Sequence, residues 1–130
     1  MALAVALIIP YISGTKKIAF QRRDNQAPTD PNVLGLFGGG IEKGELPLDA
    51  AYREIHEETS LRIKRDALRP LYETDLSTPR GVVKVYMFTT AIPDEPFKVY
   101  EGTGYECYTK DEFLARDDVS ESAVRLLKRI

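Results

Sequence analysis

The sequence predicts an α/β sandwich in which a mixed β-sheet lies between helices, and three observations support this prediction. The chain opens with a continuous apolar segment, 2–11, which has the length of a strand that is buried on both faces. Apolar residues at helical spacing occupy the segment 47–60, between strand-like segments, and they recur in 119–130. This order of strands, helix, strands and helix is typical of sheets that are covered by helices.

The length and composition indicate one compact domain over residues 1–130. The hydrophobic fraction of 43% and the charged fraction of 29% are ordinary for a soluble globular protein. The net charge of -2 gives no electrostatic reason to bind a nucleic-acid polymer or an acidic membrane. The apolar start lacks a basic flank, contains Pro10 and is too short to span a bilayer. We therefore expect a soluble, cytoplasmic protein without a membrane partner.

The single cysteine and the single histidine limit the sites that the chain can form. Cys107 has no partner for an intramolecular disulfide, and no zinc site of the Cys/His type is expected because His56 is the only histidine. Cys107 stands among tyrosines and is expected to be buried and inert. His56 lies about 100° around a helix from each neighbouring residue, so we expect it outside any ligand set.

Local signals predict the elements of the first third of the chain. Ser13-Gly14 is a turn signal, and 17–21 returns as the second strand. The polar segment 24–32 contains two prolines and is expected to form an exposed loop. The segment 33–37 is predicted as a short strand that enters a glycine loop.

The central helix is predicted over about 47–60. Pro47 fits its first turn, where the missing N–H costs little, and Asp49 favours the same end through the helix dipole. Its expected buried face follows spacings of three and four, and it consists of Leu48, Ala51, Tyr52, Ile55 and Thr59. Later strand-like segments are 68–75, 82–92 and 105–108, with a polar turn at 77–81 after the first of them.

Three carboxylates form a stripe on this helix. Glu54, Glu57 and Glu58 span about 100° of the helix wheel, beside the buried face. Glu54 and Glu58 are a like-charge pair that alone costs a helix about 0.2–0.5 kcal/mol, and such an uncompensated cost is typical of functional positions. Mg²⁺ would compensate it, because this ion prefers oxygen ligands and binds carboxylates together with substrate phosphates. The alternative is a solvated helix face whose glutamates pair with neighbouring cations.

The spacing of further residues around the stripe identifies a family. The pattern Gly39, Glu45, Arg53-Glu54-Ile55, Glu57-Glu58 and Ser60-Leu61 resembles the Nudix box of Nudix hydrolases. The strand order and the chain length also look like a whole Nudix domain. The resemblance implies a Nudix-type α/β/α sandwich. It also implies Mg²⁺-dependent hydrolysis, with Mn²⁺ able to substitute, of a nucleoside diphosphate that is linked to another moiety.

The resemblance also implies roles for the box residues. The three carboxylates of the stripe would bind metal, and one of them would help to deprotonate or orient the attacking water. Arg53 would orient a glutamate of this cluster, Glu45 would fix Arg53, and the carbonyl of Gly39 resembles the backbone metal ligand of the family. The catalytic set implied in this way is Glu54, Glu57, Glu58, Arg53 and Glu45.

Two positions depart from the family pattern. Ser60 stands where a glycine normally ends the helix, so we expect the cap to be strained or shifted without the loss of a ligand. Phe37 precedes the paired glycines at a position that is often proline. It is expected to alter the rigidity of the loop or to present an aromatic ring near the substrate.

Residues outside the box supply further candidates. Glu101, beside Gly102, resembles a loop glutamate that some Nudix hydrolases add as a metal ligand or water-orienting group; Glu95 and Glu106 are alternatives. Arg22 and Arg23 end the second strand, and a guanidinium can bind two phosphate oxygens at once. Adjacent strand residues face opposite sides, so only one arginine is expected in the cleft, and Arg23 is favoured. Phe37, Gly38 and Gly40 complete the substrate-binding candidates, and Phe37, Tyr86 and Phe88 could instead be core.

The function expected from these residues is that of a pyrophosphohydrolase that cleaves a nucleoside triphosphate, normal or oxidised, to a monophosphate and pyrophosphate. Nucleotide sugars, ADP-ribose and dinucleotide polyphosphates are alternative substrates, and a non-catalytic nucleotide-binding module is an alternative class. Isoprenoid diphosphate isomerisation needs cysteine and histidine chemistry that one Cys and one His do not supply. The expected partner is a small nucleoside diphosphate derivative, and the family also allows a homodimer.

Overall fold

The computed structural model describes residues 3–26 and 31–130. Residue 2 of the first predicted strand and residues 27–30 of the predicted loop lie outside the described part. In chain order, the elements are β1 (Ala4–Ile12), β2 (Lys17–Arg22), β3 (Leu34–Gly35), β4 (Phe37–Gly40), α1 (Pro47–Glu58), the 3₁₀ helix η1 (Arg65–Ala67), β5 (Arg69–Thr78), β6 (Gly81–Ile92), β7 (Gly104–Thr109), α2 (Lys110–Leu114) and α3 (Glu121–Leu127).

The strands form one mixed sheet that forks at β1 and β2. β6 runs parallel to β1 along its whole length, so β4 and one end of β2 share the other edge of β1. In the same way β7 pairs along all of β2, and β1 and β3 share the remaining edge of β2. β5 closes the sheet as the antiparallel neighbour of β6.

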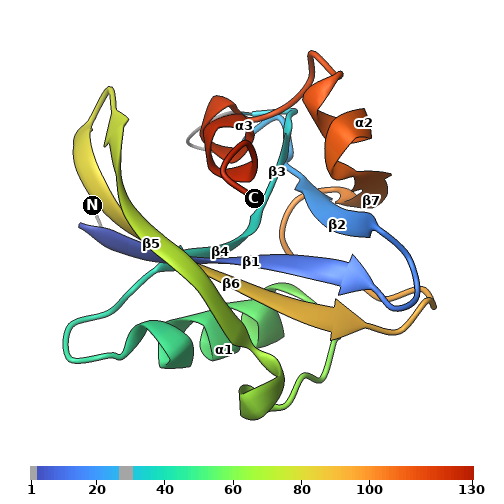
Figure 1. Ribbon diagram of the computed structural model, residues 1–130, viewed down its shortest axis with the longest axis horizontal. Helices are drawn as coiled ribbons and strands as arrows, with labels where there is room; N and C mark the ends of the chain where they lie inside the picture. Colours follow the sequence, from blue (N-terminus) through green and yellow to red (C-terminus); the bar gives the residue numbers. More distant parts are fainter. Residues whose placement is uncertain (1–2, 27–30) are drawn as a thin grey trace.

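The helices cover both faces of the sheet, which confirms the predicted sandwich. In Figure 1, α1 lies below the sheet and α2 and α3 lie above it. Two apolar clusters fill the two sides: one contains Ala51 and Ile55 of α1, and the other contains Phe113 of α2 and Leu126 of α3. β1 contributes to both clusters, as a strand buried on both faces must.

Two predicted boundaries differ from the structure, and one helix was not predicted. The glycines 38–40 are part of strand β4, paired with β1, and not of a loop, because glycines without side chains let the two backbones and α1 approach closely. α1 ends at Glu58 rather than near residue 60. The helix α2 was not predicted, although its capping box from Thr109 to Glu112 is a signal in the sequence.

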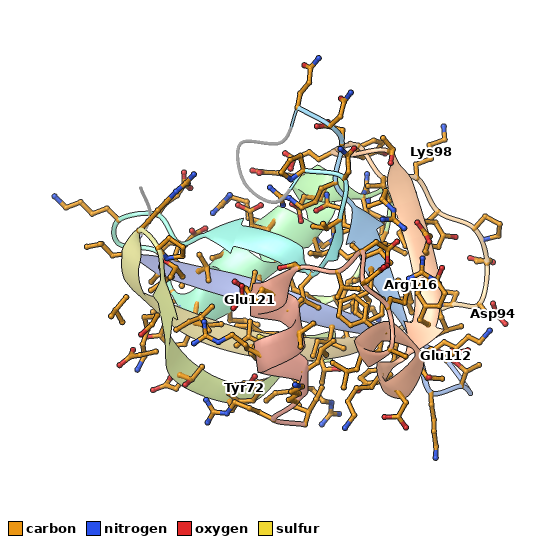
Figure 2. All side chains as sticks on the ribbon, turned by 90° about the horizontal axis from the view of Figure 1, so that it is seen from above. Tyr72, Asp94, Lys98, Glu112, Arg116 and Glu121 are labelled. Atoms are coloured by element: carbon orange, nitrogen blue, oxygen red, sulfur yellow. The ribbon has the colours of Figure 1, made fainter. Side chains whose placement is uncertain are left out.

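Two further features complete the fold. Tyr72 of β5 lies beside α3 in Figure 2, and its hydroxyl donates a hydrogen bond of 2.6 Å to the Leu126 carbonyl, which ties the last helix to the sheet. Among the described residues, no helix has both the length and the apolar character that crossing a membrane requires.

Candidate active site

The site is built around α1, which packs tightly against β1 and β4. Ala50 and Ala51 are completely buried, and these small side chains let the helix come close to the glycine strand. The stripe of glutamates is therefore not uniformly exposed. The Glu58 residue is only 3% exposed, the Glu54 side chain is 14% exposed, and the Glu57 side chain is 56% exposed. Glu58 belongs to the buried face of the helix, which the helical spacing had not indicated.

Arg53 joins the box residues, as the family pattern implied. Its Nε and Nη2 atoms donate to the two carboxylate oxygens of Glu45, each at 2.9 Å, which is the bidentate geometry of a strong ion pair. Nη2 also donates to the Gly40 carbonyl at 3.0 Å, and Nη1 donates to Glu54 at 2.9 Å. The hydrogen bond from Arg53 lowers the pKa of Glu45 to about 2. Arg53 thus fixes the entry of α1, the end of β4 and one glutamate of the stripe.

Glu58 is a buried carboxyl group with a strongly altered pKa. Its Oε1 accepts a hydrogen bond of 2.8 Å from the N–H of Gly38, which favours the charged form. Burial acts in the opposite direction and is the largest effect, and the charges of Glu54 and Glu101 add to it, so that the pKa rises to about 8. The influence of both carboxylates shows that Glu54, Glu58 and Glu101 lie close together in space.

Glu54 lies directly against the glycine strand. A Cβ atom on Gly39 would stand 2.7 Å from the Glu54 carboxyl carbon, so this position leaves no room for a side chain. Burial is also the main reason that the pKa of Glu54 is raised. Gly38 is more constrained still: its φ is +132°, and a Cβ added there would stand 2.2 Å from the Ala6 carbonyl oxygen, so both features demand glycine.

Glu101 comes to this cluster from the segment between β6 and β7. The Glu101 carboxylate is near enough to Glu58 to raise the pKa of that group, and the backbone carbonyl of Glu101 accepts a hydrogen bond of 3.0 Å from the side chain of Gln21. The alternatives lie elsewhere: Glu106 pairs with Arg22 at 2.8 Å, and Glu95 lines a different cavity. Among the three loop candidates, the structure therefore brings Glu101 to the carboxylates of α1.

The carboxylates lie near one another, but their oxygen atoms do not converge on a single metal position. Among the described residues, no three His, Cys, Asp or Glu side chains converge as a ready metal site. Arg53 engages Glu54, and it also lies 3.4 Å from Glu57. The donor chemistry nevertheless fits a hard divalent cation, because three crowded carboxylates repel one another and a cation would relieve that repulsion.

The two adjacent arginines of β2 have different environments. Arg22 donates to Glu106 at 2.8 Å and to Asp118 at 2.9 Å, so its guanidinium holds β7 and the segment before α3 together. These bonds raise the pKa of Arg22, and the carboxylate pKa values of both partners are lowered. Arg23 instead lines the cleft that also contains Gly38 and Gly39. Of the two predicted phosphate contacts, the structure places Arg23 at the site.

The remaining aromatic and glycine candidates occupy structural positions. Phe37 is completely buried in the cluster beneath α1, so the expected aromatic surface near the substrate is not present. The reason is the pairing of β4 with β1, which turns this side chain into the core. Phe88 is also buried and Tyr86 packs against the same cluster, in agreement with the core alternative. Gly40 contributes its carbonyl to Arg53 rather than to an open surface.

His56 and Cys107 lie outside the carboxylate cluster. The Ile63 N–H donates to Nε2 of His56 at 3.1 Å, so Nδ1 carries the ring proton and donates to the Tyr52 carbonyl at 2.6 Å. His56 therefore links Ile63, in the segment after α1, to the helix through two hydrogen bonds. Cys107 is half-buried, and burial raises the pKa of its thiol, which disfavours the reactive thiolate.

Two features of the site were not found from the sequence. Gln21 is only 4% exposed and orients the Glu101 backbone, but a single glutamine in a strand gives no signal for such a role. The cleft between the sheet and α3 has a volume of about 330 Å³ and begins at Gly38 and Gly39. The residues that line it come from several strands that are distant in sequence, so the cleft cannot be recognised before the sheet is assembled.

The pKa of Glu58 predicts an unusual dependence of stability on pH when no divalent metal is present. The folded-state pKa of Glu58 is raised to about 8, whereas the unfolded-state pKa is about 4.5. The resulting stabilisation is therefore complete at pH values below about 4.5, and it is lost as the pH rises to about 8. Each tenfold change in the ionisation constant corresponds to about 1.4 kcal/mol, so the loss should be on the order of a few kcal/mol. The lowered pKa values of Glu45, Glu106 and Asp118 act below this range.

Urea unfolding in EDTA between about pH 5 and pH 8.5 measures this effect. Wild-type stability should fall across the range, whereas Glu58→Gln, which keeps an acceptor for the Gly38 N–H, should change little. Parallel curves for the two proteins would show that Glu58 ionises normally in the fold.

Comparison with known proteins shows the family of the chain. A profile of the NUDIX domain family matches residues 2–128, and the chain therefore belongs to this family, as the box at 39–61 predicted. The m7GpppN-mRNA hydrolase NUDT17 of Xenopus laevis is 40% identical over 60 residues, which are 46% of this chain and 20% of that protein. The chain thus spans about a fifth of the length of this relative.

Solved structures confirm the predicted fold. DR0079 from Deinococcus radiodurans superposes with a TM-score of 0.82 at 24% identity, over 98% of this chain and 82% of that one. The E. coli dihydroneopterin triphosphate pyrophosphohydrolase gives a TM-score of 0.78 at 18% identity, over 98% and 93% of the two chains. At these identities the likeness establishes the architecture, and the chemistry must be argued from the residues of the site.

Proposed function

We propose that this protein is a Mg²⁺-dependent pyrophosphohydrolase that cleaves the diphosphate linkage of a nucleoside triphosphate, normal or oxidised. The observation that carries the proposal is the cluster of Glu54, Glu58 and Glu101 against the glycine strand. Glu58 is buried, the Glu54 side chain is 14% exposed and Glu101 stands at the exposed side, and the repulsion between these carboxylates is a cost that a bound cation would remove. The E. coli dihydroneopterin triphosphate pyrophosphohydrolase is named for a triphosphate substrate, which supports the same type of cleaved bond.

Glu54, Glu58 and Glu101 are the residues that would hold the metal, with Glu57 at the exposed rim and the Gly39 carbonyl as a further donor. When bound, Mg²⁺ would stabilise the charge on the diphosphate oxygens and lower the pKa of a water molecule. Arg53 keeps the stripe in place through Glu45, and Arg23 stands at the cleft where a guanidinium can contact phosphate oxygens. Glu58 or Glu101 would accept the proton of the attacking water.

The cleft beside α3 would receive the nucleoside. It shares Gly38, Gly39 and Arg23 with the phosphate end of the site, so one ligand can reach both. Its walls are mainly aliphatic, and they include Val5, Leu7, Leu36, Leu76, Val83, Val85 and Leu126. Hydroxyl groups of Thr78, Ser120 and Ser122 are the other polar side chains along it. Such a lining favours a neutral, flat group such as a nucleobase.

The relative NUDT17 suggests a capped RNA end as a second substrate class. A 7-methylguanine base is cationic, and such cations are usually bound between aromatic rings or beside acidic groups. Among the described residues that line the cleft, there is neither an aromatic nor an acidic side chain. The cleft therefore favours neutral bases over this class.

Narrowing the cleft should weaken substrate binding selectively. Val83→Phe places a larger side chain in the cleft, so KM should rise about tenfold with little change in kcat, because the interaction lost is with the nucleoside. Val82→Phe is the matched control, since Val82 is the adjacent strand residue and is 60% exposed. Steady-state kinetics on the best substrate measure both variants. Equal KM values for Val83→Phe and wild type would place the nucleoside elsewhere.

A hydrolysis screen tests the proposed function directly. Nucleoside triphosphates, oxidised nucleotides, nucleotide sugars, ADP-ribose, dinucleotide polyphosphates and a cap analogue are incubated with the protein in Mg²⁺, in Mn²⁺ and in EDTA. Chromatography of the nucleotide products, with assays for phosphate and pyrophosphate, identifies the bond that breaks. We expect a nucleoside monophosphate and pyrophosphate from triphosphates, and nothing in EDTA. Metal binding without turnover on any compound would indicate a non-catalytic binding module.

A further inference from the structure

We infer that Ser60 is a positioning residue: its hydroxyl group holds the segment 98–100 against the end of α1 and so keeps Glu101 beside Glu58. The inference rests on the proposed function, because it concerns the arrangement of a metal-binding carboxylate. It explains the position at which this chain departs most clearly from the family pattern.

The end of α1 has a different geometry from the glycine cap that the family pattern implies. Thr59 is extended, with φ of −140° and ψ of 165°, and it forms an antiparallel bridge with Val99. The Tyr100 N–H donates to the Glu58 carbonyl at 2.7 Å, and the Ser60 N–H donates to the Lys98 carbonyl at 2.9 Å. The chain therefore leaves the helix as a short strand that pairs with the segment before Glu101.

The Ser60 side chain completes this pairing. Its Oγ accepts a hydrogen bond of 2.8 Å from the Lys98 N–H. The Lys98 side chain extends outward from the surface in Figure 2, so the contact is made by its backbone alone. A glycine at position 60 could form the backbone bonds but could not supply this acceptor.

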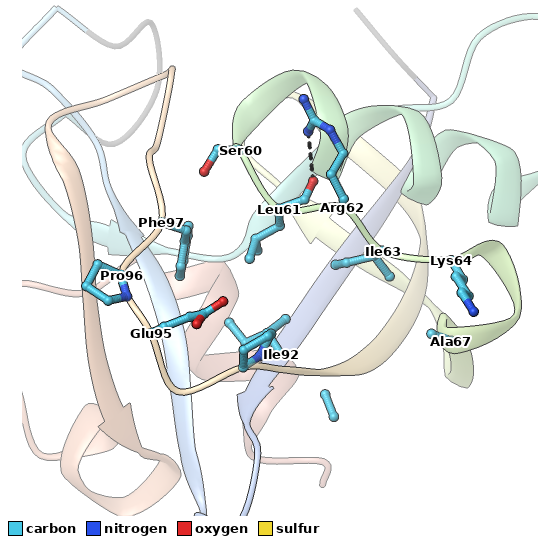
Figure 3. A pocket seen from close by; sticks show the side chains of 12 residues that line it. Ser60, Leu61, Arg62, Ile63, Lys64, Ala67, Ile92, Glu95, Pro96 and Phe97 are labelled. Atoms are coloured by element: carbon cyan, nitrogen blue, oxygen red, sulfur yellow. Dashed lines mark hydrogen bonds between the residues drawn. The ribbon is translucent and has the colours of Figure 1, made fainter.

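Packing supports this segment only in part. A cavity of about 420 Å³ lies between residues 60–64 and residues 92–97, and Figure 3 shows Ser60 at its edge, near Phe97. Phe97 stacks on Tyr105, with ring centroids 3.9 Å apart, and Val99 packs against the cluster beneath α1, whereas Lys98 and Tyr100 are exposed. Hydrogen bonds to Glu58 and Ser60 therefore set the register of the backbone that leads to Glu101.

The other side of Glu101 is fixed by β2. Gly102 lies so close to the Arg22 carbonyl that an added Cβ would stand 2.3 Å from its oxygen, and the Thr103 N–H donates to the same carbonyl at 3.0 Å. Glu101 is thus held between a support at β2 and a support at the end of α1. Removing the Ser60 hydroxyl weakens only the second support.

Binding of Mn²⁺, followed by electron paramagnetic resonance, tests this role without requiring turnover. Ser60→Ala should weaken Mn²⁺ binding about three- to tenfold, and Ser60→Thr, which keeps the hydroxyl group, should remain within twofold of wild type. Glu101→Gln should weaken binding as well, and Ser60→Ala should then add nothing further. Thr15→Ala is the matched control, since the Thr15 hydroxyl also accepts an exposed backbone N–H, that of Lys17, in a distant turn.

Amide hydrogen exchange provides a second measurement in EDTA. Ser60→Ala should accelerate exchange at the Lys98 and Tyr100 amides, whereas amides in β1 keep the wild-type rates. An undiminished effect of Ser60→Ala in the Glu101→Gln background, or unchanged Mn²⁺ binding by Ser60→Ala, would overturn the inference. Mn²⁺ binding without hydrolysis would overturn only the proposed function, while a wild-type protein that binds no Mn²⁺ would overturn both.

Discussion

Replacing Glu58 by glutamine is expected to lower kcat/KM on the best substrate by about 10²–10³-fold while the protein remains folded. The substitution removes the negative charge that a divalent cation needs, at the most buried member of the carboxylate cluster. The amide oxygen can still accept the N–H of Gly38, and glutamine has nearly the same size as glutamate, so the local packing is preserved. The loss should therefore be one of chemistry and not of fold.

The controls separate these two effects. Glu73→Gln changes an exposed glutamate of β5 that pairs with Lys84 at 3.7 Å; β6 and β1 separate it from the glycine strand, and the change should leave activity unchanged. Circular dichroism and thermal unfolding in EDTA should show that Glu58→Gln is at least as stable as wild type at pH 8, since a buried carboxylate is no longer required to ionise. A folded Glu58→Gln protein with wild-type turnover on every nucleotide would rule out this cluster as the catalytic site.

The sequence predicted the positions of the box residues, but it did not predict which of the glutamates are buried. Helical spacing correctly grouped the three glutamates on one stripe, because the periodicity of a helix is fixed by its backbone. It could not show that Glu58 lies inside and Glu57 outside, since that depends on how deeply α1 sits against β4. The depth is set by two alanines on α1 and by glycines of β4, and their contact depends on the pairing of β4 with the distant strand β1.

Phe37 shows a second limit of the sequence. An aromatic residue before paired glycines was open to two readings, a stacking surface or a core residue. The pairing of β4 with β1 decides between them, because it places Phe37 opposite Ile8 and turns its ring beneath α1. Strand pairing is a long-range property, and a short segment of sequence does not contain it.

Glu101 and the arginines illustrate the reverse case. Alternation along a strand correctly indicated that Arg22 and Arg23 have different surroundings, and the structure brings Arg23 to the cleft. The position of Glu101 was inferred from a resemblance, and the physical reason for it appears only in three dimensions. Backbone hydrogen bonds from Tyr100 to Glu58 and from Thr103 to Arg22 hold the two sides of this segment and place Glu101 beside the cluster.

Adding a single methyl group to Gly39 is expected to reduce activity about 100-fold with little loss of stability. The new Cβ would meet the Glu54 carboxylate at 2.7–2.8 Å, and this group is the end of a flexible side chain that can turn away. Glu54 would then leave its place beside Gly39, and the metal-binding arrangement would be lost. The free energy of unfolding should change by only about 1 kcal/mol, because nothing in the backbone of Gly39 demands a positive φ.

Gly38→Ala is the informative contrast to Gly39→Ala. At Gly38 the added Cβ would stand 2.2 Å from the Ala6 carbonyl oxygen and 2.8 Å from the Leu7 Cα, and neither backbone atom can move without separating β4 from β1. The positive φ adds strain, so a loss of at least about 3 kcal/mol in the free energy of unfolding is expected.

Gly35→Ala, whose Cβ meets only an ordinary contact at 3.7 Å, should be nearly as stable as wild type. Urea unfolding and Mg²⁺-dependent turnover, measured on all three variants, should therefore separate a glycine needed by the fold from one needed by the carboxylate. If Gly39→Ala keeps full activity, Glu54 does not need its place against β4, and the cluster must bind metal in another arrangement.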